Sequence, residues 1–227
     1  MTSVFVHGFL GLPSDWDDLQ IAQNTNSKFR SLWNDLNNLG DKITFSTWAD
    51  YFLATSPTGI KAYGYSLGGR LLLHAYLKKP SHFSSLHLFS TNYGLQNELE
   101  KKNRLQNDLR WAERFLSDPW DALITSWNAQ PVFTGSSKSF VRNESDFNRE
   151  LLAKSLDAFS LGRQEYLLPQ LESSKVPIHF IMGENDTKFM TLLNAISPKK
   201  NIFTHAIPGV GHRIPWEYRV SGKENWL

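Results

Sequence analysis

A serine stands at the centre of a pentapeptide whose glycine spacing is typical of a catalytic nucleophile. The pentapeptide Gly64-Tyr65-Ser66-Leu67-Gly68 follows a short apolar run, Ile60–Tyr63, and opens an amphipathic segment, Gly69–Lys79. A strand that turns sharply into a helix exposes the serine hydroxyl at the sheet edge, and the flanking glycines avoid side-chain clashes in that turn. The helix N-terminus behind the serine favours developing negative charge. We therefore predict that Ser66 is catalytic.

A serine hydroxyl needs a base, and two later segments supply an acid and a histidine. The β-rich run Ile178–Met182 leads into a turn that ends in Asp186, and Ile202–Ala206 leads into a glycine-containing loop that ends in His212. Serine, aspartate and histidine in this chain order are typical of the α/β-hydrolase fold. Each residue follows the end of an expected strand, where active sites of open α/β sheets form. We therefore predict a triad of Ser66, Asp186 and His212.

The first expected strand, Ser3–Val6, also leads into a loop that could take part in chemistry. That loop reads His7-Gly8-Phe9-Leu10-Gly11. Its Phe9 backbone N–H, together with that of Leu67, would form a two-donor oxyanion hole. We interpret His7 as the residue that holds this loop, rather than as an acid or base.

The elements that position these residues alternate between short apolar runs and helical patterns. Such alternation predicts an α/β fold with a mostly parallel sheet of about six strands. The antiparallel strands that open many α/β hydrolases are not expected, because the chain begins directly at the strand before His7. The expected strands are Ser3–Val6, Ile43–Thr47, Ile60–Tyr63, Ser85–Phe89, Ile178–Met182 and Ile202–Ala206, and the expected helices outside the middle of the chain are Lys28–Asn38 and Gly68–Lys79.

The middle of the chain breaks this alternation. Residues 94–171 contain no convincing strand, and their amphipathic stretches are Leu95–Leu116, Pro119–Trp127 and Asp146–Phe159. We predict a helical lid inserted into a core formed by residues 1–93 and 172–227.

Composition excludes several classes of protein. The 227 residues carry 24 Lys+Arg against 22 Asp+Glu, which is too balanced for a nucleic-acid or membrane-surface binder. Cysteine is absent, which excludes disulfides, a thiol nucleophile and thiolate metal sites. No apolar run is long enough for a signal peptide or a membrane span. We expect a cytoplasmic protein without a metal site.

Simpler interpretations remain for the same residues. Ser66 could be an ordinary turn serine, His212 a loop histidine that caps a carbonyl, and Asp186 a turn former and helix cap. Glu184 is the alternative acid, less suitably placed. The scattered histidines are better explained as core or surface residues: His74, His82, His87, His179 and His205.

The chain resembles a particular family, the 2-succinyl-6-hydroxy-2,4-cyclohexadiene-1-carboxylate (SHCHC) synthases of menaquinone biosynthesis, which have the α/β-hydrolase fold. The resemblance covers most of the chain and is most specific in the insertion. The motifs that carry it are His7-Gly8-Phe9-Leu10-Gly11 with Trp16, Gly64-Tyr65-Ser66-Leu67-Gly68-Gly69-Arg70, Gly94-Leu95-Gln96-Asn97, Arg104, Asp108, Trp111-Ala112-Glu113-Arg114-Phe115-Leu116, Pro119, Trp127-Asn128-Ala129-Gln130-Pro131-Val132-Phe133, Gly183-Glu184-Asn185-Asp186-Thr187-Lys188-Phe189 and Gly211-His212. The usual Asp-x-Pro-Gly-His-Gly turn is replaced by Ser46-Thr47-Trp48-Ala49-Asp50.

The resemblance implies a lyase that eliminates pyruvate without a cofactor, with Ser66 as the base. The substrate carries three carboxylates, so its site should present arginines, whose guanidinium groups bind carboxylates in a bidentate manner. The residues that the resemblance places at the substrate are Arg70, Arg104, Tyr65, Trp127 and His7, with Arg142 as the later arginine and Arg149 and Arg163 as its alternatives.

Two other function classes compete with this interpretation. The first is a serine hydrolase of the same fold that acts on an ester, a thioester or a carbon–carbon bond through an acyl-enzyme. The second is a non-catalytic binding protein, which gives no reason for a triad and an oxyanion loop to occur together. The lyase needs convergent arginines, whereas a general esterase favours an apolar acyl pocket.

Overall fold

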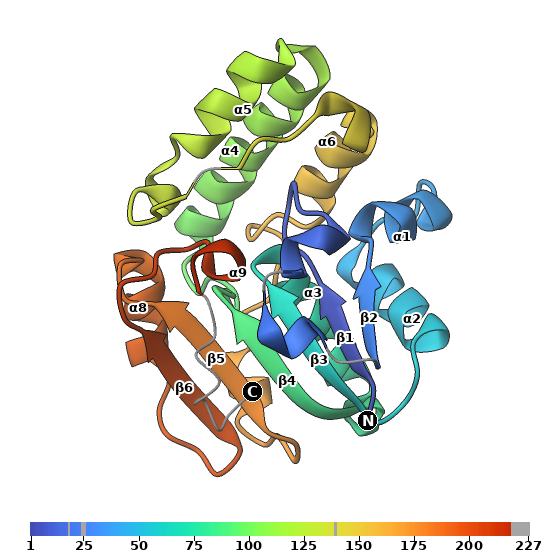
Figure 1. Cartoon of the computed structure of the whole chain (residues 1–227), viewed down its shortest axis with the longest axis vertical. Coiled ribbons are helices and arrows are strands. Elements are labelled where there is room, and N and C mark those ends of the chain that lie inside the picture. Colours follow the sequence, from blue (N-terminus) through green and yellow to red (C-terminus); the bar gives the residue numbers. More distant parts are fainter. Residues whose placement is uncertain (18, 24–25, 139, 219–227) are drawn as a thin grey trace.

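One parallel sheet forms the centre of the molecule (Figure 1). The computed structural model describes residues 1–17, 19–23, 26–138 and 140–218, and over these residues six strands pair in the order β2-β1-β3-β4-β5-β6. Every neighbouring pair is parallel, which confirms the expected fold class. The strands are β1 (Ser3–Val6), β2 (Ser27–Arg30), β3 (Ile60–Tyr65), β4 (Phe83–Phe89), β5 (Ile178–Gly183) and β6 (Ile202–Ile207).

The helices that follow these strands cover the sheet and its carboxyl end. The α-helices are α1 (Leu32–Leu39), α2 (Phe45–Thr55), α3 (Leu67–Lys78), α4 (Glu98–Ser117), α5 (Trp120–Asn128), α6 (Arg149–Ala158), α7 (Leu168–Leu171), α8 (Thr187–Asn194) and α9 (Ile214–Glu217). Short 3-10 turns are η1 (Pro13–Trp16), η2 (Gln20–Gln23), η3 (Pro80–His82), η4 (Pro131–Phe133) and η5 (Glu144–Asp146).

One predicted strand is wrong. Residues Ile43–Thr47 contain the start of α2 instead of a strand. Thr44 caps this helix, because its side chain accepts the Thr47 N–H while the Thr47 hydroxyl accepts the Thr44 N–H. This reciprocal capping box satisfies two backbone donors that a helix start otherwise leaves unpaired.

The sixth strand comes from a segment that was expected to be helical. Residues Lys28–Asn38 divide into β2 and α1, and Ser31 marks the boundary because its hydroxyl accepts the Asn34 N–H. Among the described residues, strand β2 pairs with β1 alone and forms one edge of the sheet. Half-exposed Phe29 lies on this edge strand.

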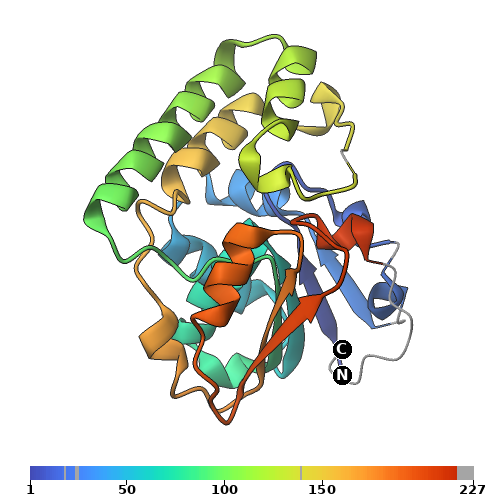
Figure 2. The ribbon, with the colours of Figure 1, turned by 90° about the vertical axis from the view of Figure 1, so that its left-hand side faces the viewer.

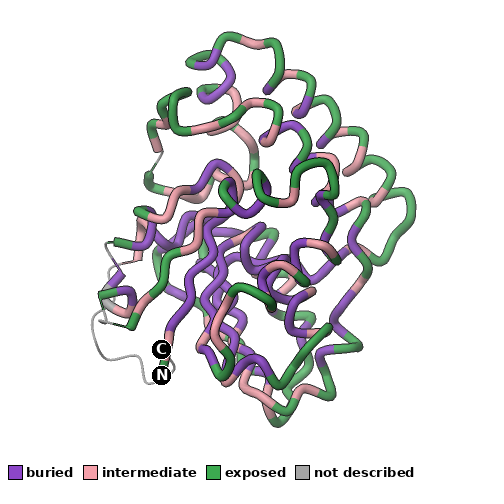
Figure 3. The backbone as a smooth tube through the Cα atoms, turned by 90° about the vertical axis from the view of Figure 1, so that its right-hand side faces the viewer, coloured by how far each residue is buried: buried purple, intermediate pink, exposed green. Residues whose placement is uncertain are grey.

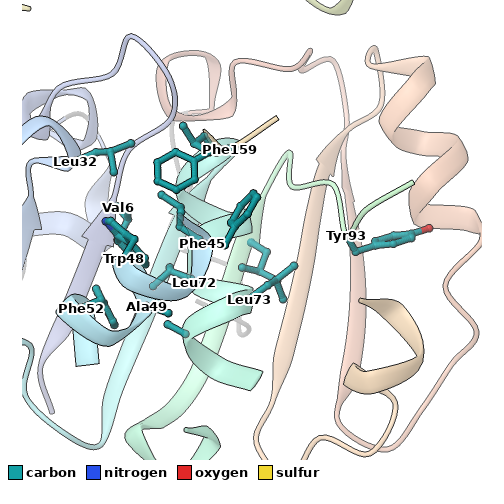
Figure 4. Close-up of a cluster of buried hydrophobic side chains, with 14 of the residues drawn as sticks. Val6, Leu32, Phe45, Trp48, Ala49, Phe52, Leu72, Leu73, Tyr93 and Phe159 are labelled. Carbon is teal, nitrogen blue, oxygen red and sulfur yellow. The ribbon is translucent and has the colours of Figure 1, made fainter. Parts of the chain in front are cut away.

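The apolar core fills one face of the sheet. Alternate strand residues such as Val6 point into it, and α2 and α3 cover it with Trp48, Phe52 and Leu72 (Figure 4). These side chains are fully buried. The core continues into the insertion through residues such as Phe115 on α4. The insertion and the sheet therefore share one apolar interior.

The opposite face carries an aromatic row with one ring from each strand. The rings stack at centroid distances of 5.2, 4.6, 4.5, 4.7 and 4.9 Å, following the register of the sheet. In strand order the row is Phe29, Phe5, Tyr63, His87, His179 and Phe203. Cross-strand ring pairs of this kind stabilise a sheet and fix its register.

Two buried histidines make stability depend on pH. Burial lowers the pKa of His7 to about 4 and that of His87 to about 2, so the fold holds both rings neutral. An unfolded histidine titrates near 6.5, so the unfolded chain takes up protons that the folded chain does not. The free energy of unfolding should therefore fall by about 2 kcal/mol per ring between pH 6.5 and pH 4.5.

Urea unfolding followed by tryptophan fluorescence at both pH values measures this loss. The variant His87→Gln should lose less stability on acidification than the wild type, because its unfolded chain takes up one proton fewer. Equal losses in the two proteins would contradict the assignment to His87.

Helices α4, α5 and α6 lie beyond the carboxyl ends of the strands (Figures 1 and 2). No strand interrupts the described part of residues 94–171. The inner strands β1, β3, β4 and β5 are buried along most of their length, whereas the edge strands β2 and β6 are partly exposed and the outward side of the insertion is largely exposed (Figure 3). Within the described ranges, no helix combines the length and apolar character that crossing a bilayer requires.

Candidate active site

Ser66 occupies a strained turn between β3 and α3. Its backbone has φ 50° and ψ −109°, a conformation that residues other than glycine rarely adopt, and its N–H donates to the Phe89 carbonyl. A Cβ added to Gly68 would lie 2.2 Å from the Val6 carbonyl oxygen. The glycine therefore allows α3 to start directly against the end of β1, where the loop from His7 to Gly11 begins.

His212 and Asp186 are in direct contact. The His212 Nδ1 lies 2.6 Å from an Asp186 carboxylate oxygen, and both residues are buried. The other carboxylate oxygen accepts the Phe189 N–H, so Asp186 also caps α8. A carboxylate on Nδ1 fixes the tautomer that leaves Nε2 able to accept a proton. Glu184, the alternative acid, is exposed.

Ser66 and His212 line the same cavity, which has a volume of about 340 Å³. Within the described chain, no hydrogen bond joins the Ser66 hydroxyl to the His212 ring. Catalytic hydrogen bonds often tighten only when a substrate is bound. The structure thus brings the three residues of the predicted triad to one site, and their catalytic roles remain a prediction.

The loop after β1 is held by His7. Its Nε2 accepts the Leu32 N–H at 3.0 Å, which leaves Nδ1 protonated and able to donate to the Gly8 carbonyl at 2.8 Å. The Trp33 Nε1–H donates to the Gly11 carbonyl, and this hydrogen bond also stabilises the loop. His7 is not among the residues that line the cavity, so its contacts agree with a loop-holding role and not with a substrate contact.

Phe9 and Leu67, the two expected oxyanion-hole residues, both line the cavity. Leu67 is the first residue of α3, where a backbone N–H has no partner within the helix. Among the described residues, no protein acceptor is assigned to the N–H of Phe9 or of Leu67. The two donors are therefore available to a ligand oxygen.

Arg70 is a buried cation in the cavity wall. Its Nε donates to the Gln164 side-chain oxygen at 2.6 Å and its Nη2 to the Phe159 carbonyl at 2.5 Å. Burial, with help from the charge of Arg104, lowers the pKa of Arg70 to about 9, so the group stays charged at neutral pH. In the described structure, no carboxylate lies within 4 Å of it.

Arg104 and Asp108 form an ion pair in the same wall. The Arg104 Nε contacts both Asp108 carboxylate oxygens, at 2.9 and 2.8 Å, and the Ser160 hydroxyl donates to one of them at 2.7 Å. Arg104 therefore lines the cavity as expected, and its Nε is already bonded to Asp108.

The wall also contains residues that were not singled out from the sequence. They are Asn92, Asn107, Gln130, Phe133 and Lys188. Gln130, Phe133 and Lys188 stand in the motifs quoted above, whereas no sequence signal marked Asn92 or Asn107. Trp127 lines the cavity as expected, whereas Tyr65 lies outside the lining, buried against the rings of His212 and Trp216.

The expectation for Arg142 is corrected. Its Nη2 binds both Asp15 carboxylate oxygens, at 2.7 and 2.8 Å, and its Nε donates to the Leu10 carbonyl at 2.7 Å. Its guanidinium is thus directed at the loop after β1, and Arg142 does not line the cavity. Its alternatives also lie elsewhere, because Arg149 pairs with Glu144 and Arg163 with Asp157.

Phe140 lies between two arginines and links the loops of the site. Arg142 and Arg213 lie 4.4 and 4.5 Å from the Phe140 ring centroid, and we call these three residues the arginine stack. Arg213 follows His212 and donates to the Lys138 carbonyl and to the side chain of Asn128. The arginine stack therefore connects the loop after β1, the insertion and the loop that carries His212.

The charged groups of the site favour an anion as its ligand. Three cations and one carboxylate line the cavity: Arg70, Arg104, Lys188 and Asp108. Among the described residues, no three histidine, aspartate or glutamate side chains are grouped as metal ligands would be.

Known proteins resemble the chain along most of its length. A family profile described as the alpha/beta hydrolase fold matches residues 4–217. The SHCHC synthase of Yersinia pestis (strain Pestoides F) is 33% identical, over 92% of this chain and 79% of that protein. The structure of MenH from S. aureus matches with a TM-score of 0.72 at 23% identity, over 96% of this chain and 88% of that one. A carboxylesterase structure from Nitrososphaera gargenis matches with a TM-score of 0.66 at 16% identity, over 94% and 84%.

Proposed function

The chain belongs to the SHCHC synthase family of the α/β hydrolases, and from this premise we propose that it is a lyase of menaquinone biosynthesis. The reaction is the 2,5-elimination of pyruvate from 2-succinyl-5-enolpyruvyl-6-hydroxy-3-cyclohexene-1-carboxylate. One observation supports it above the others: the cavity that holds Ser66 and His212 is also lined by cations that outnumber its single carboxylate.

Proton abstraction is assigned to Ser66. Asp186 holds the His212 ring through Nδ1, so Nε2 can take the Ser66 hydroxyl proton. The serine oxygen then removes the proton from the carbon α to the succinyl carbonyl, and the electron pair of that C–H bond forms an enolate. General base catalysis by such a group contributes about 10²–10⁴ in rate.

The enolate oxygen is held by the backbone N–H groups of Phe9 and Leu67, whose residues line the cavity. Preorganised donors of this kind stabilise charge as it develops. When the enolate collapses, its carbonyl re-forms, the ring double bond shifts to leave the 2,4-diene, and the C–O bond to the enolpyruvyl group breaks with its electron pair leaving on that oxygen. The proton held by His212 passes to the leaving oxygen, and the enolpyruvate that is released tautomerises to pyruvate. The sequence of steps needs no cofactor.

The carboxylates of the substrate are assigned to the basic wall. Arg70 starts from the first turn of α3, close in sequence to Ser66, and no carboxylate in the described chain neutralises it. A buried cation without a counter-ion is costly, and an anionic ligand offsets that cost. Arg104 offers its remaining guanidinium N–H groups from α4.

Ester or thioester hydrolysis through an acyl-enzyme is the second candidate. The strained turn at Ser66 and the Asp186–His212 pair would serve a nucleophile as well as a base. The charged wall argues against it as the main activity, since an acyl chain favours an apolar pocket.

An assay of pyruvate release, run beside hydrolysis of a p-nitrophenyl ester, tests this proposal. We expect fast release of pyruvate from the enolpyruvyl substrate and slow ester cleavage. Fast ester cleavage without pyruvate release would identify the chain as a hydrolase.

The variant Arg70→Met should lower kcat/KM for pyruvate release by about 10- to 100-fold, because a charge-assisted contact to a substrate carboxylate is lost. Cleavage of an uncharged ester should change much less. The exposed Arg163, paired with Asp157 outside the cavity, gives the matched control Arg163→Met. Equal effects of the two substitutions on pyruvate release would reject Arg70 as a binding residue.

The cellular setting follows the same proposal. We place the enzyme in the cytoplasm, with a small polycarboxylate as its substrate and with no nucleic-acid or membrane partner. The helices of residues 94–171 would act as the lid, since Arg104 and Trp127 reach the cavity from them.

A further inference from the structure

The cavity contains a cation that the proposed mechanism does not yet use. Of its three basic side chains, Arg104 is paired with Asp108, the one carboxylate of the lining. Arg70 donates only to uncharged oxygens. Lys188 makes no hydrogen bond or ion pair with any other described residue. Within the described residues, neither Arg70 nor Lys188 therefore has a carboxylate in ion-pair contact.

Lys188 also stands where a helix disfavours a cation. It is the second residue of α8, a helix that begins directly after its cap residue, Asp186. The N-terminus of a helix carries a partial positive charge, so a lysine there lowers helix stability unless something compensates. Burial and the nearby charge of Arg104 lower the pKa of Lys188, while the charges of Asp186, Glu100 and Asp108 act in the opposite direction. An anion bound beside Lys188 would offset both the charge of the helix N-terminus and the repulsion from Arg104.

Arg70 and Lys188 approach the reacting groups from different helices. Arg70 lies on α3, which begins after Ser66, and Lys188 lies on α8, which begins after Asp186. Phe189, the next residue along, packs its ring 4.6 Å from that of His212. A ligand that spans the cavity from α3 to α8 thus passes Ser66 and His212.

We propose that Lys188 binds a carboxylate of the substrate, in the role that the family resemblance implied for Arg142. This inference rests on the proposed function for its substrate class. It adds a specificity-determining residue: a substrate with an anionic group on the α8 side is favoured over one with an apolar group there. Lysine acts as a point charge, so it tolerates more variation in carboxylate orientation than a bidentate arginine.

Steady-state kinetics of pyruvate release test the assignment. The variant Lys188→Gln should raise KM by about 10-fold or more while kcat changes less than about threefold, and Lys188→Arg should restore most of the affinity. The effect should shrink at high salt, because the interaction is one between charges. The matched control is Lys200→Gln, which removes an exposed lysine outside the cavity.

Two outcomes overturn the inference. One is a KM in Lys188→Gln that equals the wild-type value. The other is a fall in kcat with unchanged KM, which would mean that Lys188 acts by positioning Asp186. Thermal unfolding of each variant separates both from a loss of fold.

A binding experiment keeps this inference separate from the proposed reaction. Calorimetric titration with propane-1,2,3-tricarboxylate needs no turnover, and the trimethyl ester of the same compound is its uncharged control. We expect the acid to bind, the ester not to bind, and Lys188→Gln to weaken the acid by about 10-fold. A protein that binds the acid but releases no pyruvate would retain the anion site and lose the lyase assignment. Equal binding of the acid by Lys188→Gln and wild type would reject Lys188 as the carboxylate-binding residue and leave the lyase assignment unaffected.

Discussion

Replacing Ser66 with alanine is expected to lower kcat for pyruvate release by about 10²- to 10⁴-fold, the contribution of a positioned base. The substitution removes only the hydroxyl that is assigned to take the proton from the substrate. The carboxylate-binding residues are untouched, so KM should change by less than about threefold. The backbone at this position already has φ 50°, and alanine tolerates that angle about as well as serine does. We expect the free energy of unfolding to stay within about 1 kcal/mol of the wild type.

Stopped-flow detection of pyruvate measures the first quantity and urea unfolding the second. Ser117→Ala, which removes an exposed hydroxyl at the end of α4, is the matched control and should be silent in both. Turnover close to the wild-type rate in Ser66→Ala would end the case for a serine base. A covalent adduct between Ser66 and the substrate, detected by mass spectrometry, would favour the acyl-enzyme alternative.

Replacing Gly68 with alanine is expected to have the largest effect on the fold. The new Cβ would lie 2.2 Å from the Val6 carbonyl oxygen and 2.5 Å from that of His7. Both are backbone atoms, so relief requires α3 to move away from β1. We expect the free energy of unfolding to fall by about 3 kcal/mol, with a fall in kcat because the Leu67 N–H moves with the helix.

Gly59→Ala separates this clash from the general cost of adding a Cβ to glycine. Gly59 has φ +69°, and nothing lies within 4 Å of its added Cβ. Only the backbone conformation is strained there, at a cost of about 1–2 kcal/mol. Equal losses of stability in the two variants, measured by urea unfolding, would show that the contact between α3 and β1 is not tight.

The buried strands could be predicted because their information is local. Runs such as Ile178–Met182 are apolar on both faces, as the inner strands of a parallel sheet must be. The edge strand β2 could not be predicted, because it pairs on one side only and its Lys28 and Phe29 are exposed. The run at Ile43–Thr47 was misleading because two of its β-branched residues serve a helix start: Thr44 is the N-cap of α2 and Thr47 lies in its first turn.

In the candidate site too, features set by local sequence could be predicted and features set by tertiary contacts could not. The contact between His212 and Asp186 was predictable, because turns after adjacent parallel strands meet at one edge of the sheet. The direction of Arg142 was not, because a long side chain outside regular structure is placed by tertiary contacts, here with Asp15. Lys188 follows a predicted catalytic residue, yet only the packing of α8 shows that it reaches the cavity.

The arginine stack has a consequence for how this architecture can change over evolution or in the laboratory. One short stretch of the insertion contacts both loops: Arg142 donates to the Leu10 carbonyl, and the Phe140 ring packs against Arg213. Replacing the insertion between β4 and β5 with a foreign one would therefore remove contacts that hold the loop after β1 and the loop that carries His212, in addition to the residues that line the cavity. We therefore expect exchange of the insertion to succeed only when its side-chain partners at residues 15 and 213 are exchanged with it.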